Sequence, residues 1–89
     1  MQTQVVTQIA IHVTYNGVTE SLDVQQHERV IAVIERAANA FHIRENRHLL
    51  ALFRQDGTEV NDQQSVLDAG LRAGEVLALR PSRVKGGTE

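Results

Sequence analysis

Two runs of alternating side chains, joined by Asn16-Gly17, constrain the fold of this chain more than any other feature. In residues 9–15 every second side chain is large and apolar: Ile9, Ile11, Val13 and Tyr15. Period-two alternation in β-branched residues predicts a strand with one solvated face. Asn and Gly both tolerate positive φ, which suits a two-residue type I′ turn. Residues 18–24 alternate again, with Glu20 interrupting the apolar set. We therefore predict an antiparallel hairpin.

The hydrophobic period changes after the hairpin. Between Glu28 and Phe41 the apolar residues recur at spacings of three and four: Val30, Val33, Ile34, Ala37, Ala38 and Phe41. This spacing places them on one face and predicts an amphipathic helix of roughly four turns. Gln25, Gln26 and His27 precede it, so its start lacks a good capping side chain. Ile31 lies at the edge of the apolar stripe.

The second half of the chain contains shorter segments. Residues 49–53 predict a buried strand, and residues 58–60 a very short returning strand. Residues 65–69 suit a single helical or 3₁₀ turn. Residues 75–80 alternate and predict the last strand, which Pro81 should end or confine to an edge because proline lacks the N–H donor. The order ββαββ-turn-β predicts the α+β class, with one helix packed across a sheet face.

Composition excludes several classes of protein. The 89 residues suffice for one small domain, and without cysteine there is no disulfide, thiolate metal site or catalytic cysteine. A formal net charge of −2 argues against binding to nucleic acid or to an anionic membrane. We find no targeting signal and no apolar run approaching about 18 residues, the length of a membrane span. We therefore expect a soluble cytoplasmic protein.

The polar residues form no recognisable catalytic or metal-binding motif. The separations between the four histidines fit no zinc motif: His12, His27, His42 and His48. None of the serines stands in a nucleophile-elbow context. We therefore expect no enzymatic activity, no metal and no cofactor, and we expect Phe41 and Phe53 to belong to the core or to its edge.

The order and spacing of these landmarks resemble ubiquitin and its β-grasp relatives, from about Ile9 to Gly87. The residues that carry the resemblance are Ile11-His12-Val13, Leu22-Asp23-Val24, Val30, Val33, Ala37, Ile43, Leu50-Ala51-Leu52, Val66-Leu67-Asp68, Leu71, Leu77-Ala78-Leu79 and Gly86-Gly87. The resemblance implies a mixed sheet of four to five strands packed on one helix. It divides the chain into a flexible leader (1–8), a β-grasp domain (9–81) and a flexible tail (82–89).

The same resemblance implies a protein modifier or a sulfur carrier. In both, an activating enzyme adenylates the carboxylate of the last glycine, here Gly87, with Gly86 beside it in the enzyme channel. Glycine has no Cβ, so such a pair can thread a narrow channel. Thr88 and Glu89 follow the pair, so activation requires a peptidase cut between Gly87 and Thr88. This extension favours a processed modifier, which a conjugating enzyme transfers to target proteins.

The resemblance also marks surfaces for partners. Ala51, Ala78 and Arg80 match the outward apolar patch of ubiquitin, but they are smaller or charged, so ordinary ubiquitin receptors are not expected to bind. Arg80, Arg83 and Lys85 either steer the tail into an acidic groove of the activating enzyme or keep the end of the chain solvated. Further candidates for a partner surface are Ile31 and Val76.

The basic residues are very uneven, because eight are arginine and Lys85 is the only lysine. An isopeptide-linked polymer could therefore use only Lys85 or the amino terminus. This composition is similar to that of bacterial ubiquitin-like modifiers encoded with activating, conjugating and peptidase partners. The residues leave three alternatives open: a non-conjugated interaction domain, a sulfur carrier, and a Gly-Gly pair that is only a soluble tail.

Overall fold

The hairpin predicted around Asn16-Gly17 is confirmed. The computed structural model describes residues 8–82, and its first two strands, β1 (Gln8–Tyr15) and β2 (Val18–Gln25), pair antiparallel. Asn16 and Gly17 have φ angles of 51° and 80°, as a type I′ turn requires. The turn chemistry therefore sets the register that gives β1 one apolar face.

The amphipathic helix, α1 (Val30–Ala40), is present but shorter than the predicted range of 28–41. As expected, no side chain caps its start. The free amides of the first turn are satisfied from a distant segment instead. The Val30 amide donates to the Gln64 carbonyl at 2.9 Å, and the Ile31 amide to the Asp62 carbonyl at 3.1 Å. Backbone carbonyls brought close by folding thus replace the local cap.

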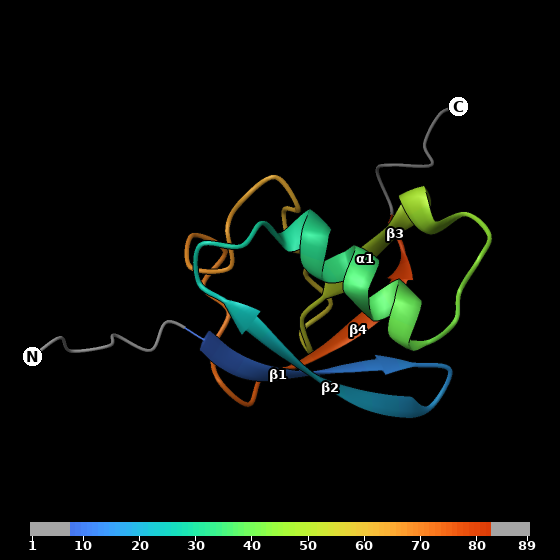
Figure 1. Cartoon of the computed structure of the whole chain (residues 1–89), viewed down its shortest axis with the longest axis horizontal. Coiled ribbons are helices and arrows are strands. Elements are labelled where there is room, and N and C mark those ends of the chain that lie inside the picture. Colours follow the sequence, from blue (N-terminus) through green and yellow to red (C-terminus); the bar gives the residue numbers. More distant parts are fainter. Residues whose placement is uncertain (1–7, 83–89) are drawn as a thin grey trace, which may run out of the picture.

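A four-stranded mixed sheet lies under this helix, as the predicted fold class requires (Figure 1). The later strands are β3 (Leu50–Phe53) and β4 (Val76–Pro81), and the strand order is β2-β1-β4-β3. β4 pairs parallel to β1 and antiparallel to β3. β4 therefore lies in the middle of the sheet, between β1 and β3. It ends at Pro81, which is paired with Leu50 at the start of β3.

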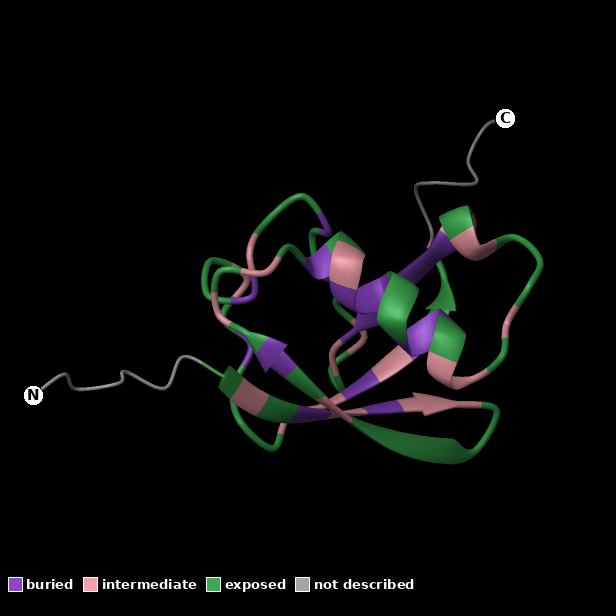
Figure 2. Ribbon diagram, viewed as in Figure 1, coloured by how far each residue is buried: buried purple, intermediate pink, exposed green. Residues whose placement is uncertain are grey.

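The core lies where α1 faces the sheet, and Figure 2 shows the buried residues gathered there. It is built from the predicted apolar positions of the hairpin, the helix and the later strands: Ile11, Val13, Val24, Val30, Val33, Ile34, Ala37, Ala38, Leu50, Leu52, Val60, Val66, Leu71, Leu77 and Leu79. Ile31 is 38% exposed, as its place at the edge of the helix stripe suggests. Within residues 8–82 no helix is long and apolar enough to cross a membrane.

The prediction of a short returning strand at 58–60 is wrong. Glu59 forms one isolated bridge with Phe53, and the described part of the sheet has four strands. Two backbone bonds hold the segment to β3, from the Arg54 amide to the Thr58 carbonyl and from the Val60 amide to the Leu52 carbonyl, each at 2.8 Å. The chain then turns at Asn61, whose side chain accepts from the Gln63 amide. The ladder therefore stops before a strand can form.

The predicted single turn at 65–69 is present as one hydrogen bond, from the Ala69 amide to the Ser65 carbonyl at 2.9 Å, and not as a helix. Neighbouring amides bond elsewhere: Val66 donates to the Glu28 carbonyl and Leu67 to the Gln26 carbonyl. These bonds tie the segment to the chain just before α1, so it cannot extend as a helix.

The segment between α1 and β3 contains one short element of its own. A 3₁₀-helix, η1 (Arg47–Leu49), follows Asn46, which has a φ angle of 60°. β3 consequently begins at Leu50, one residue later than predicted. The half-buried Ile43 packs against the core from this loop.

Candidate functional site

The residues predicted to carry activation lie outside the part of the chain that the structure describes. These are Arg83, Lys85, Gly86, Gly87 and Thr88. The structure does describe the point from which they extend, because β4 ends at Pro81 and Ser82 follows. The candidate site is therefore built here from the base of the tail and from the outer face of the sheet, the face opposite α1.

Ser82 is fixed to the domain through both its backbone and its side chain. Its amide donates to the Leu49 carbonyl at 2.7 Å, and its hydroxyl donates to Glu59 Oε2 at 2.5 Å. A hydroxyl-to-carboxylate bond of this length is charge-assisted and stronger than a neutral one. Leu49 and Glu59 precede Ser82 by 33 and 23 residues, so no local sequence signal could identify them. Together they define where the tail leaves the sheet.

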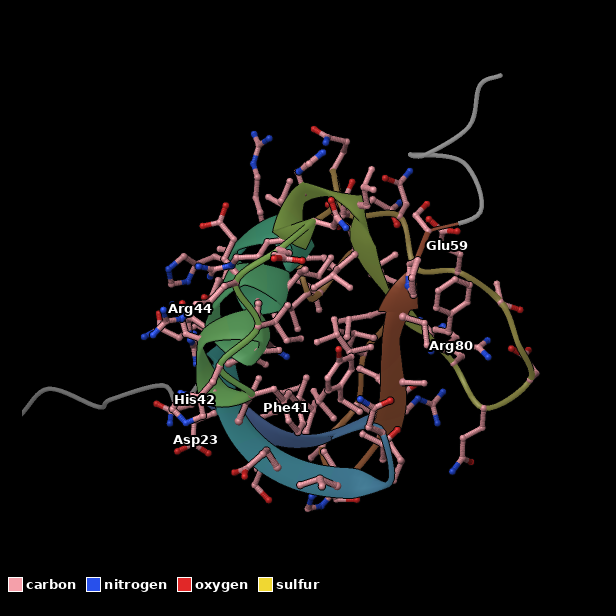
Figure 3. The ribbon with its side chains drawn as sticks, turned by 90° about the vertical axis from the view of Figure 1, so that its right-hand side faces the viewer. Asp23, Phe41, His42, Arg44, Glu59 and Arg80 are labelled. Atoms are coloured by element: carbon pink, nitrogen blue, oxygen red, sulfur yellow. The ribbon has the colours of Figure 1, made fainter. Side chains whose placement is uncertain are left out.

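Arg80 lies on the outer face beside the base of the tail. Its guanidinium carbon is 4.7 Å from the centroid of the Phe53 ring, a cation–π arrangement. The ring is only 2% exposed, whereas Arg80 is exposed. Phe53 is thus a buried residue, as predicted, and it supports a surface cation. Figure 3 shows Arg80 and Glu59 on the same side of the molecule.

The other predicted surface residues differ in accessibility. Ala51 pairs with Arg80 in the sheet register and has 0% of its surface exposed, so its side chain is not accessible to a partner. Ala78 is half-buried between Thr14 of β1 and Phe53 of β3. Val76 is also half-buried. The outer face therefore offers small, partly covered side chains with Arg80 at one end, and not a broad apolar patch.

The hairpin contributes one polar pair to this face. Ser21 Oγ lies 3.0 Å from His12 Nδ1, across the antiparallel register of β1 and β2. His12 is half-buried and Ser21 is exposed. Within residues 8–82 no group of three or more histidine or carboxylate side chains could hold a metal ion. This pair can stabilise the hairpin through a cross-strand hydrogen bond.

Comparison with solved structures assigns the architecture to the ubiquitin-like β-grasp fold. A de novo designed protein based on ubiquitin matches with a TM-score of 0.74 and 18% identity, over 92% of this chain and 98% of that one. The N-terminal ubiquitin-like domain of the 4931431F19Rik protein matches with a TM-score of 0.72 and 15% identity, over 100% of this chain and 90% of that one.

A third similar structure is ATBAG1, solved in complex with HSP70, with a TM-score of 0.71 and 12% identity. The match covers 85% of this chain and 41% of that one. No family model matches the chain, and no curated protein matches it. At these identities the likeness establishes the fold, and the function has to be argued from the chain's own residues.

Proposed function

We propose that this chain is a ubiquitin-like protein modifier, processed after Gly87 and then activated at that residue for conjugation to target proteins. The observation that carries the proposal is the position of Gly86-Gly87, four residues beyond Ser82, after the last strand of a ubiquitin-like fold. The hydrogen bonds of Ser82 support it, because they give the tail a defined origin on the sheet.

The proposed chemistry has four steps. A peptidase hydrolyses the Gly87–Thr88 peptide bond and leaves a carboxylate on Gly87. That carboxylate attacks the α-phosphate of ATP in the activating enzyme, which forms an acyl-adenylate and releases pyrophosphate. A cysteine thiolate of the enzyme then displaces AMP to form a thioester, and a conjugating enzyme passes the acyl group to an amine of the target. The chain has no cysteine, so in this scheme it is the substrate and supplies no nucleophilic sulfur.

Charge and composition support two further parts of the proposal. Arg80 presents an exposed guanidinium close to the base of the tail, and with Arg83 and Lys85 it would favour an acidic groove in the activating enzyme. The chain has eight arginines and one lysine, and this imbalance favours a relationship to bacterial ubiquitin-like modifiers. It restricts any polymer to Lys85 or the amino terminus.

The test is activation of a chain that ends at Gly87. We expect it to support ATP–pyrophosphate exchange with the activating enzyme encoded beside its gene. The matched controls are the same chain with Gly87→Ala and the chain that retains Thr88 and Glu89, both of which should lose exchange. Equal exchange in all three, or none in any, would contradict the proposal.

A second candidate is a ubiquitin-like interaction domain that is never conjugated. The outer sheet face favours it, since Val76 and Ala78 are half-buried beside the exposed Arg80, and one similar structure is the N-terminal domain of a protein. Deletion of residues 86–89 should then leave partner binding intact. Intact mass after expression with the neighbouring genes separates the candidates. Loss of two residues supports processing, an unchanged mass supports the interaction domain, and added sulfur on Gly87 indicates a sulfur carrier.

A further inference from the structure

A groove runs between α1 and the segment that leads into β3, on the opposite face of the sheet from Arg80. Its lining residues are Ile31, Ile34, Glu35, Arg44, Asn46, Arg47 and His48. Ile31, which is 38% exposed, provides its apolar surface, and Ile34, which is 2% exposed, lies in the core beneath it. An exposed Ile31 beside a buried Ile34 offers a partner a contact that is continuous with the core.

One wall of the groove is held in place by an arginine. Arg47 Nη2 donates to the Glu35 carbonyl of α1 at 3.1 Å and to Asn39 Oδ1 at 2.7 Å. Both acceptors are neutral, so these bonds fix the side chain without neutralising its charge. Asn46, with a φ angle of 60°, turns the chain into η1 directly before Arg47. The cation is therefore presented in a defined position, which lowers the entropic cost of binding.

The groove is locally cationic on a chain that carries a net charge of −2. Arg44 and Arg47 form no ion pair with any residue between 8 and 82. Glu35 is the one carboxylate among the lining residues. This combination of an exposed isoleucine and two arginines against one carboxylate is complementary to an acidic segment. The negative charge of the whole chain disfavours a nucleic acid as the occupant.

We propose that this groove binds a short acidic segment of a partner protein that also carries a bulky apolar residue. The apolar side chain packs on Ile31, and flanking carboxylates pair with Arg44 and Arg47. Figure 3 shows Arg44 on the helix side, opposite the side that holds Arg80 and Glu59. Binding here consequently leaves the outer sheet face around Arg80 accessible, and the inference does not depend on conjugation.

The experiment is a nuclear magnetic resonance titration of the full ¹⁵N-labelled chain. The probe is a capped octapeptide with two central leucines and three acidic residues on each side. The expected result is saturable shift changes confined to residues 31–35 and 44–48. Matched peptides with amides in place of the carboxylates, or with serines in place of the leucines, should bind at least about tenfold more weakly, since each removes one half of the recognition.

Two pairs of variants locate the site on the chain. Arg44→Glu should weaken binding about tenfold, whereas Arg72→Glu, an equal charge change at an exposed loop residue, should leave it within about twofold. Ile31→Ser should likewise weaken binding, and Leu67→Ser, at a residue that is 60% exposed and does not line the groove, should not. All four positions are exposed, so the variants are expected to fold.

Four outcomes would overturn the inference. They include shift changes on the outer sheet face and the absence of binding at millimolar peptide. Another is an equal loss of binding with Arg72→Glu, which would indicate general electrostatic attraction. The last is shifts in the groove that follow protein concentration without peptide, which would make a second copy of the chain the occupant.

Discussion

Arg54 shows how a single side chain can organise a loop far from it in the sequence. Its Nη1 donates to Glu75 Oε2 at 2.7 Å, and its Nη2 donates to the Ala69 carbonyl. The other carboxylate oxygen of Glu75 accepts from the Arg72 amide at 3.0 Å. The planar guanidinium fork thereby links the end of β3 to the connection that leads into β4. The Arg54–Glu75 pair is 21 residues apart, so no sequence spacing rule could predict it.

Asp56 provides a prediction at the scale of one residue. The Thr58 hydroxyl and then the Thr58 amide, which donates to Asp56 Oδ1 at 2.9 Å, lower the pKa of this carboxyl below its ordinary value of 3.8. Thr58→Ala should raise the pKa of Asp56 toward 3.8, because it removes the hydroxyl donor. Thr58→Ser keeps that donor and should leave the pKa low. A ¹³C titration of the carboxyl group measures both, and equal pKa values in the two variants would refute the role of the hydroxyl.

Because the pKa of Asp56 is lowered in the folded chain, the contribution of this carboxyl to stability depends on pH. The folded state favours the ionised carboxyl, so its contribution to the free energy of unfolding is present above the unfolded pKa. That contribution is lost as the pH falls from about 3.8 through the lowered pKa of the folded chain. Asp56 is fully exposed, and solvent screening keeps the contribution small.

At the scale of elements, the hairpin and the helix obtain their stability differently. The hairpin turn is encoded locally, since Asn16 and Gly17 adopt the positive φ angles that their residue types allow. The start of α1 is not encoded locally, because its first amides donate to the carbonyls of Gln64 and Asp62. The hairpin can therefore form early and locally, whereas the first turn of the helix depends on the later loop.

Substitution of Gly17 tests the local origin of the turn. A Cβ at this position would meet no atom within 4 Å, so any cost is conformational. Gly17 has a φ of 80°, and Gly17→Val should lower the free energy of unfolding by about 1–2 kcal/mol, the penalty of the left-handed region. Gly17→Asn, a residue that tolerates this region, should cost clearly less. Urea denaturation measures both variants, and equal losses would show that the backbone angle is not the cause.

At the scale of the whole molecule, β4 is the element that unites the domain. It is the last strand of the described chain, yet it lies between β1 and β3 and supplies Leu77 and Leu79 to the core. Its parallel pairing with β1 joins residues more than 60 apart, as Val13 opposite Leu77 illustrates. The non-local contacts that complete this fold therefore concentrate on one short strand.

Substitution of Leu77 tests the contribution of β4 to the stability of the domain. It is 0% exposed, and Leu77→Ala should lower the free energy of unfolding by about 2–5 kcal/mol, because it removes buried surface and leaves a cavity. Leu67→Ala is the matched control at a leucine that is 60% exposed, and we expect a change within about 0.5 kcal/mol. Comparable losses at the two positions would contradict the central role assigned to β4.

The local and periodic features of the fold were open to prediction from the sequence. The hairpin, the apolar face of α1, the buried β3 and the inward leucines of β4 follow from hydrophobic period and turn chemistry. The strand expected at 58–60 failed, because three residues cannot show whether a segment continues a ladder or turns away. In the candidate site, the resemblance to ubiquitin marks Arg80 as a surface residue, whereas no feature of the sequence indicates its support by Phe53.

By itself, the amino-acid sequence determined the elements, their inward faces and the Gly86-Gly87 pair beyond the last strand, because these depend on neighbouring residues and a repeat of two or 3.6. Only the tertiary structure decided which distant groups meet. It placed Glu59 against Ser82, withdrew Ala51 from solvent and brought Arg44 and Arg47 to the groove beside Ile31. These contacts arise from strand order and loop path, which join residues 13 or more positions apart. No local pattern records such distances.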